Sequence, residues 1–330
     1  MRSKPNIDLN DIVLPFQLNK SNIRGRFVRL SETLDKIFEQ HEYPSVVEAL
    51  VTEAAVLTVL IGQMVKLRWR LSLQIRGDGP IRLVATDYYG PTKKGEPGQI
   101  RAYASFDQDR IKPSEEGFPQ IGSGYFAIII DQGDDMKPYQ GITPLSGESL
   151  ASCAETYFAQ SEQIPTKFSI SYGKSTGYEK EQSWRSGGIM VQHMPNPSPA
   201  ANQGSDNEEK YPLQTPKPLF DEPKENWSRV NILLNTAEEF ELIGPNLSQT
   251  QTLVRLFNDE GIYLSPEQEI KFGCTCSEKK VQQTMSIYST KDIKHMTKKD
   301  GSLTADCQFC GAHYILDPST LGFEAPKLQK

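Results

Sequence analysis

Residues 71–87, LSLQIRGDGPIRLVATD, determine the fold class expected for the larger part of the chain. Leu71, Leu73 and Ile75 alternate with polar residues, and the alternation resumes at Ile81. The Gly-Asp-Gly-Pro between the two runs supplies a turn, so this stretch predicts a β-hairpin. We therefore expect an antiparallel sheet around it.

Further strands and helices are predicted on both sides of the hairpin from the spacing of apolar residues. The predicted strands are 26–30, 100–104, 125–131, 139–143, 168–172 and 189–194. The predicted helices are 31–40, which Ser31 would cap, 45–66 and 149–160. Strands joined by short turns with few helices between them favour an α+β fold with largely antiparallel sheets. We expect residues 1–194 to form this domain.

The composition changes at residue 195, which begins the predicted linker, residues 195–262. Its first part, 195–226, has seven prolines and few apolar residues, and this predicts a flexible segment. Its second part, 227–262, holds two capping-box patterns, at residues 236–239 and 248–251, which predict short amphipathic helices. Helices this short are marginally stable alone. We therefore expect them to dock on another part of the chain.

Four of the five cysteines lie in residues 263–330, which we expect to form a small separate module. They make two close pairs, Cys274-Thr-Cys276 and Cys307-Gln-Phe-Cys310. Two pairs of thiolates match the tetrahedral ligand set of a structural zinc ion. A module with so few apolar residues needs such a staple, and zinc binding contributes on the order of 10–16 kcal/mol in small zinc domains. The sequence predicts one structural Zn²⁺ held by the four cysteines.

The first cysteine pair is tighter than in an ordinary zinc ribbon, because a single residue separates Cys274 from Cys276. Such a pair can chelate a metal, and its sulfurs are also close enough to form a strained, reducible disulfide. Cys307 and Cys310 can likewise close on each other. The site can thus exist as a zinc tetrathiolate or as two local disulfides. Oxidation of the ligands is expected to unfold the module and to release the short helices before it.

Charge and hydropathy exclude several classes of protein. A net charge of −6 and a pI near 5.4 argue against a general nucleic-acid or anionic-membrane binder. The N-terminus lacks the pattern of a signal peptide, and the longest apolar stretch, residues 54–65, is too short to span a bilayer. We expect a cytoplasmic protein whose thiols are reduced.

Other interpretations of the cysteine region compete with that of a structural zinc site. Residues 271–300 hold seven lysines against three acidic residues, so a nucleic-acid-binding zinc ribbon is the alternative function. A catalytic thiol pair at Cys307 and Cys310 is disfavoured, because a glycine and strand-like residues follow it rather than a helix. His313 is expected to be a strand residue and Cys153 a core residue. No catalytic triad or carboxylate pair stands out, so no enzyme is predicted.

Both ends of the chain are similar to the redox-regulated holdase chaperones of the 33 kDa heat-shock protein (33 kDa chaperonin) family. The similarity extends from about residue 23 to residue 317. The segments that carry it are IRGRFVRL (23–30), LSLQIRGDGPIRLVATD (71–87), GESLASCAETYFAQSEQIPT (147–166), GGIMVQHMP (187–195), FGCTCS (272–277) and CQFCGAHYIL (307–316).

This resemblance implies an ATP-independent holdase, a stress-response chaperone that is inactive while reduced and zinc-bound. Peroxide or hypochlorite with heat would form the disulfides Cys274–Cys276 and Cys307–Cys310 and release the zinc. The module and linker would then unfold. The product implied is an active homodimer that binds unfolding client proteins and prevents their aggregation.

Overall fold

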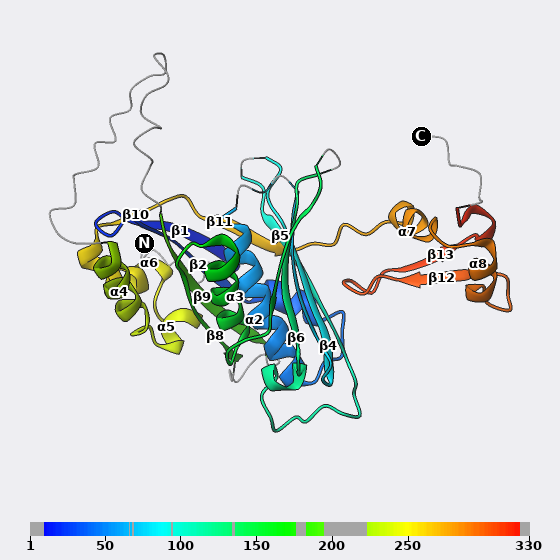
Figure 1. The fold of residues 1–330 in the computed structure, drawn as a ribbon, viewed down its shortest axis with the longest axis horizontal. Helices are drawn as coiled ribbons and strands as arrows, with labels where there is room; N and C mark the ends of the chain where they lie inside the picture. The colour runs from blue at the N-terminus through cyan, green and yellow to red at the C-terminus, as the bar shows by residue number, and fades with distance from the viewer. Residues whose placement is uncertain are drawn as a thin grey trace, which may run out of the picture.

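The computed structural model describes residues 10–65, 67, 69–93, 95–133, 136–175, 183–194 and 223–323. It consists of one large sheet with helices packed on it and a small C-terminal module built on a two-stranded hairpin (Figure 1). The α+β class predicted from the sequence is confirmed. The predicted flexible segment, residues 195–226, lies outside the described residues apart from its last four.

The large sheet has eleven strands in the order β7-β6-β3-β4-β5-β11-β1-β2-β9-β8, with β10 paired to β1 beside this path. Neighbours run antiparallel, except that β11 and β5 are parallel. The strands are β1 Ile12–Leu18, β2 Ile23–Leu30, β3 Arg70–Gly77, β4 Ile81–Tyr89, β5 Gly98–Phe106, β6 Gly124–Asp131, β7 Tyr139–Pro144, β8 Thr166–Lys174, β9 Trp184–His193, β10 Ile262–Leu264 and β11 Gln268–Phe272.

The predicted hairpin is confirmed as β3 and β4, which pair from Arg70 opposite Tyr89 to Arg76 opposite Leu83. Every other strand predicted from the sequence coincides with one in the structure to within a few residues. β1, β10 and β11 were not predicted. β10 has three residues and β11 five, too few to show a clear alternation of apolar and polar side chains.

Helix α2, Ser45–Gly62, is the centre of the main core. It lies between two groups of strands of the sheet (Figure 1). Its core is shared with Leu73 of β3 and Ile100 of β5 on one side, and with Val28 of β2 and Met190 of β9 on the other. Within the described part of the chain it is the one helix long and apolar enough to cross a membrane, but 83% of it is buried inside this fold. The apolar stretch is therefore a core element.

Helix α1, Glu32–Phe38, begins where the sequence predicts, but Ser31 does not cap it through its side chain. The carboxylate of Asp11 takes this role. It accepts hydrogen bonds from the backbone N–H groups of Ser31, Glu32 and Thr33 at 3.0, 2.9 and 3.0 Å. An acidic side chain suits the positive end of a helix dipole, and one that lies twenty residues away in the chain leaves no local signal.

Helix α3, Leu150–Tyr157, packs its apolar stripe into the same core, and Cys153 on it is fully buried, as predicted. Ser149 and Ser152 form its capping box. Glu53 of α2 lies against this helix start and accepts a hydrogen bond from the N–H of Ala151 at 3.0 Å. The contact joins α2 to α3 through a buried carboxyl group.

Three helices precede the C-terminal module and pack on the outer face of β1, β2 and β9. They are α4 Pro223–Leu234, α5 Glu239–Ile243 and α6 Gln249–Phe257. The predicted capping box of α6, Ser248 with Gln251, is confirmed. The box predicted at residues 236–239 is wrong, because α5 is capped two residues later by Glu238 with Glu241.

We expected the cysteine-bearing module to begin at residue 263, but β10 and β11 lie in the large sheet, where Ile270 belongs to the main core. Only the chain after Phe272 leaves the sheet. The module contains α7 Glu278–Met285, α8 Thr290–Met296, β12 Leu303–Asp306 and β13 His313–Leu316. Its own core has four buried apolar side chains, namely Ile293, Leu303, Leu316 and Leu321.

Glu53 predicts a pH dependence of stability. Burial raises its pKa from 4.5 to about 7, against the opposing hydrogen bonds from the α3 backbone. Between these two values the folded state holds a proton that the unfolded state releases, so stability should fall as pH rises from about 4.5 to about 7. Glu53→Gln should remove this loss and give a melting temperature above that of the parent at pH 8, measured by circular dichroism.

The matched control is Glu39→Gln, because the Glu39 side chain is 52% exposed and pairs with Lys36 at the surface. Equal pH dependence in the parent, E53Q and E39Q would show that Glu53 is ionised in the fold throughout this range.

Candidate metal centre

The structure brings all four predicted cysteines together from two loops. Cys274 and Cys276 follow β11, and Cys307 and Cys310 lie in the turn between β12 and β13. Their four Sγ atoms lie within 4.8 Å of one another, with 3.7 Å from Cys274 to Cys307 and 3.3 Å from Cys276 to Cys310. Zn–S bonds of about 2.3 Å place the sulfurs of a tetrahedral site about 3.8 Å apart. The cluster therefore has the dimensions of a single metal site.

The turn between β12 and β13 depends on Gly311. The N–H of Gly311 donates to the carbonyl of Cys307 at 2.9 Å, and the N–H of Cys307 donates to the carbonyl of Ala312 at 2.9 Å. Gly311 has φ of +65°, in the left-handed region that favours glycine. This tight turn after the second pair directs both thiols to the same side.

Two side chains donate hydrogen bonds to the sulfurs from outside the cluster. The hydroxyl of Tyr314 donates to Cys276 Sγ at 3.0 Å, and Arg101 Nη1 donates to Cys274 Sγ at 3.3 Å. Such donors stabilise the negative charge of metal-bound thiolates. Tyr314 comes from β13, next to the second cysteine pair, whereas Arg101 belongs to β5 of the large sheet. The centre is thus bound from both parts of the molecule.

The environment affects the thiols differently. Burial raises the pKa of Cys274, but hydrogen bonds from the backbone of Cys276 and from Arg101 outweigh this effect and lower the pKa to about 7. For Cys307 and Cys310, burial raises the pKa and outweighs the hydrogen bonds that lower it. A cation held by all four sulfurs would keep all of them as thiolates, and its binding would release the protons.

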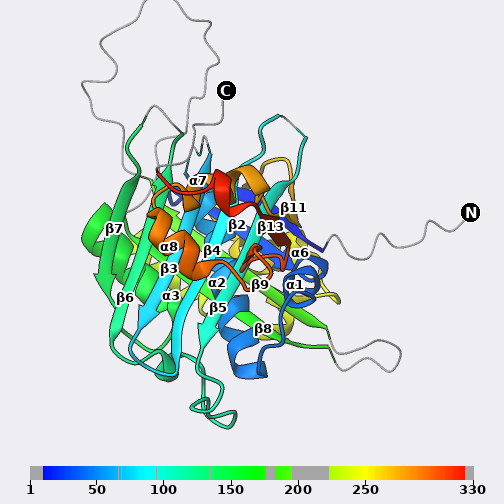
Figure 2. The ribbon, with the colours of Figure 1, turned by 90° about the vertical axis from the view of Figure 1, so that its right-hand side faces the viewer.

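The cysteine loops contact the strands β4 and β5 of the large sheet, and the module lies over this side of the sheet (Figure 2). The ring of Phe309, between the two cysteines of the second pair, meets Tyr103 edge to face at 5.8 Å. The hydroxyl of Thr275 donates to that of Tyr89 at 3.1 Å. Sequence analysis missed these partners, because they lie in strands more than 160 residues away.

His313 is a strand residue, as predicted. It lies in β13, its side chain is half exposed, and its Nδ1 is 2.6 Å from the carboxylate of Asp306. Among the described residues the cluster that could hold a metal comprises the four cysteines alone.

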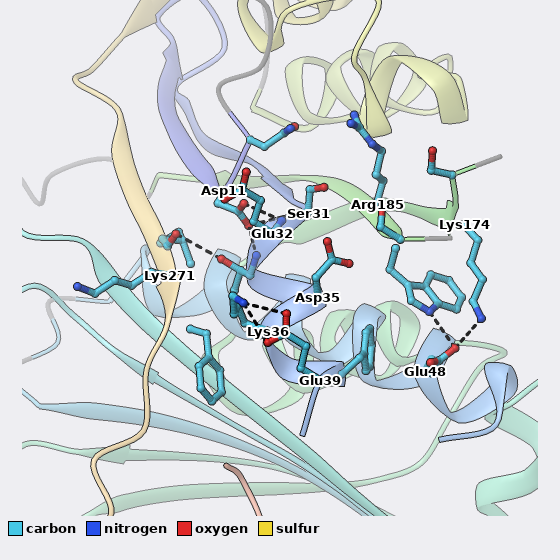
Figure 3. Close-up of a pocket in the computed structure, with 18 of the residues that line it drawn as sticks. Asp11, Ser31, Glu32, Asp35, Lys36, Glu39, Glu48, Lys174, Arg185 and Lys271 are labelled. Atoms are coloured by element: carbon cyan, nitrogen blue, oxygen red, sulfur yellow. Dashed lines mark hydrogen bonds and ion pairs between the residues drawn. The ribbon is translucent and has the colours of Figure 1, made fainter. Parts of the chain in front are cut away.

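A large open cleft of about 1130 Å³ lies elsewhere, around α1, the start of α2 and the ends of β8, β9 and β11 (Figure 3). Two ion pairs lie in its lining. Glu48 accepts from Lys174 at 2.7 Å and from the indole of Trp184 at 3.0 Å, and Lys36 pairs with Glu39. The contacts of Glu48 join α2 to β8 and β9, whereas the pair of Lys36 with Glu39 lies at the C-terminal end of α1. The cysteines are not part of the lining.

Comparisons with known proteins agree along nearly the whole chain. The family model described as Hsp33 protein matches residues 11–317. The 33 kDa chaperonin of Caulobacter vibrioides (strain NA1000 / CB15N) is 37% identical over 317 residues, which cover 94% of this chain and 96% of that protein. The 33 kDa chaperonin of Proteus mirabilis (strain HI4320) is 32% identical over 305 residues, 92% of each chain.

Among solved structures, the 33 kDa chaperonin (heat shock protein 33 homolog) of Thermotoga maritima has the same fold. It matches with a TM-score of 0.70 over 94% of this chain and 96% of that one, at 20% sequence identity. The family model, the identity to the curated relatives and the four-cysteine cluster lead to one conclusion: this chain belongs to the Hsp33 family of chaperones.

Proposed function

We propose that this protein is an ATP-independent holdase that oxidation switches on. The observation that carries the proposal is an apolar sheet face covered by three short helices, which the strands β10 and β11 connect to the four-cysteine centre. A surface that is covered in the reduced protein and exposed in the oxidised protein would bind unfolding proteins only after oxidation. The chain would act in the cytoplasm, where its thiols are normally reduced.

The covered face is formed by β1, β2 and β9, and the covering side chains come from α4 to α6. The face contributes Leu14, Phe16, Leu18, Ile23, Phe27, Ile189 and Val191, and the helices contribute Val230, Leu234, Leu242, Leu253, Leu256 and Phe257. Each such side chain gains about 1.5–3 kcal/mol when it is buried. The helices are short and depend on this contact, so a modest loss of support would expose both sides of it.

Polar contacts hold the same helices to the sheet and to the turn that follows α6. Arg29 of β2 donates to the carbonyls of Glu241 and Leu242 at 2.7 and 2.9 Å, around the end of α5. Arg229 of α4 pairs with the buried carboxylate of Glu260 at 2.7 Å. Buried charges stay favourable only while their partners remain in place. The helices α4, α5 and α6, which we call the cover, should therefore separate from the sheet cooperatively.

The chain between α6 and the cysteines supplies a route from the centre to the cover. After α6 it runs through β10 and β11, and β11 pairs with β5 at three positions, Ile270 to Phe272. Gly273 then donates to the carbonyl of Ile100 at 3.1 Å, directly before Cys274. Unfolding of the module would free this end of β11 and weaken the link that holds the helices in place.

The centre would hold one Zn²⁺, which supplies a tetrahedral charge that fixes all four thiolates and with them the small module. With hydrogen peroxide as oxidant, four thiolates give up four electrons and form the disulfides Cys274–Cys276 and Cys307–Cys310. Two peroxide molecules take these electrons with four protons and become four water molecules. The pairing follows the family resemblance, whereas the ligand set is predicted from the spacing of the two cysteine pairs. The opened chain would bind client proteins as a homodimer.

The first prediction concerns the metal. The reduced protein should bind one Zn²⁺ per chain, and Cys310→Ser should weaken binding by more than about 100-fold, because loss of an outer partner alone costs 10–100-fold. Native mass spectrometry and competition with a chromogenic chelator measure this. Cys153→Ser is the control, since Cys153 is buried in α3 far from the cluster in the chain. Zinc bound equally well by C310S would contradict the four-cysteine site.

The second prediction concerns the switch. Reduced protein should leave a heat-unfolding client to aggregate, whereas peroxide-treated protein should suppress light scattering as zinc is released. Zinc release without suppression, or suppression without oxidation, would contradict the proposal.

The third prediction tests the cover directly. Phe257→Ala removes a fully buried ring from α6, at a cost of about 3–5 kcal/mol, and should make the reduced, zinc-bound protein an active holdase. Val254→Ala on the same helix is the control, because Val254 is 46% exposed. Zinc content and circular dichroism check that the rest of the fold is retained. A folded F257A as inactive as V254A would show that the covered face does not bind clients.

A further inference from the structure

One arginine of the large sheet contacts both cysteine loops. Arg101 lies in β5, donates to Cys274 Sγ at 3.3 Å, and has its guanidinium 4.0 Å from the centroid of the Phe309 ring. Cys274 belongs to the first cysteine pair and Phe309 to the second. Within the described residues, Arg101 is the one residue of the large sheet that donates a hydrogen bond to the four clustered sulfurs.

Arg101 is fixed in this position by a second buried charge. Its Nε and Nη2 donate to Asp87 Oδ2 at 2.8 and 2.5 Å, and Asp87 lies on the neighbouring strand β4. Both residues are nearly buried, at 9% and 5% exposure. Nη1 remains free of Asp87 and points to the sulfur, while the ring of Tyr89 lies 5.5 Å from the guanidinium. This preorganised pair is stronger than a surface ion pair.

We infer that Arg101 is a positioning residue that latches the reduced cysteine centre to the large sheet and slows its oxidation. The inference rests on the proposed function. Four thiolates around one Zn²⁺ carry a net charge of −2, which a neighbouring guanidinium compensates. Its hydrogen bond also stabilises the sulfur lone pairs of Cys274 and makes them less nucleophilic.

Oxidation removes the anionic sulfur of Cys274, which accepts the hydrogen bond from Arg101. In the first step the Cys274 thiolate donates an electron pair to one oxygen of a peroxide, the O–O bond breaks, and hydroxide leaves. The Cys276 thiolate then attacks the resulting sulfenic sulfur, the S–S bond forms, and a second hydroxide leaves. The disulfide is neutral, so Arg101 loses its anionic acceptor and keeps only Asp87. The same contact would thus slow the reaction and let the module separate from the sheet after it.

The geometry requires arginine rather than lysine. The planar group donates to Asp87 through two atoms and to Cys274 through a third, and it stacks on Phe309 at the same time. A lysine would supply the charge from one atom, without the fork or the stacked face.

The test uses Arg101→Met in the full, zinc-loaded chain. Zinc release after peroxide addition, followed with a chromogenic chelator, should be about tenfold faster than in the parent, as expected for loss of a hydrogen bond to a charged group. Arg82→Met is the matched control, because Arg82 lies on β4, is 60% exposed, and pairs with Asp107 away from the cysteines. Arg101→Lys should lie between R101M and the parent.

A second measurement separates a direct contact from a general loss of stability. In the Co²⁺-substituted protein, the sulfur-to-metal charge-transfer band should move to lower energy in R101M and stay unchanged in R82M, because the sulfur lone pairs lose a donor. If R101M does not fold, Asp87→Asn is the variant that tests the inference. It keeps the charge of Arg101, removes its anchor, and should give faster release than R82M.

The outcomes also separate this inference from the proposed function. A parent protein that keeps its zinc in peroxide would contradict the proposed function itself. A parent that releases zinc and suppresses aggregation, alongside an R101M with the same release rate and the same band as R82M, would overturn the latch alone.

Discussion

The molecule depends on the cover over the apolar face of β1, β2 and β9. Seven apolar side chains of these strands belong to the cluster that α4, α5 and α6 close from outside. A sheet face of this kind is stable in water only when something is packed on it. The covering helices have twelve, five and nine residues, so none would persist away from the sheet. The closed state is therefore held by contacts that are lost together.

The cysteine module, in contrast, has little apolar core to stabilise it. Its four buried apolar residues form a very small core, and no residue of α7 is buried. Four thiolates and a metal would contribute more free energy than this core, so in the proposed function the fold of the module depends on the chemical state of its sulfurs. The helices α4 to α6 and the cysteine module lie on opposite sides of the sheet in Figure 1, and the chain through β10 and β11 joins them.

The sequence predicted the parts whose signals are local. The β3–β4 hairpin, the buried helix α2, the capping box of α6 and the four cysteines were all recognised from spacing within a few residues. What it could not show were contacts between distant segments. Asp11 caps α1, β11 inserts between β5 and β1, and Arg101 reaches Cys274 across 173 positions. A strand arginine, or a five-residue strand such as β11 with only two apolar residues, carries no sign of such a partner until the chain is folded.

Hydrogen–deuterium exchange of one sample before and after peroxide treatment tests the central claim most directly, because it reports on the cover and the core at once. The account predicts that, after zinc release, amides of α4 to α6 and of the module lose protection while those of α2 keep it. Unchanged protection in α4 to α6 after complete oxidation of the cysteines would contradict it. So would loss of protection throughout the chain, including α2.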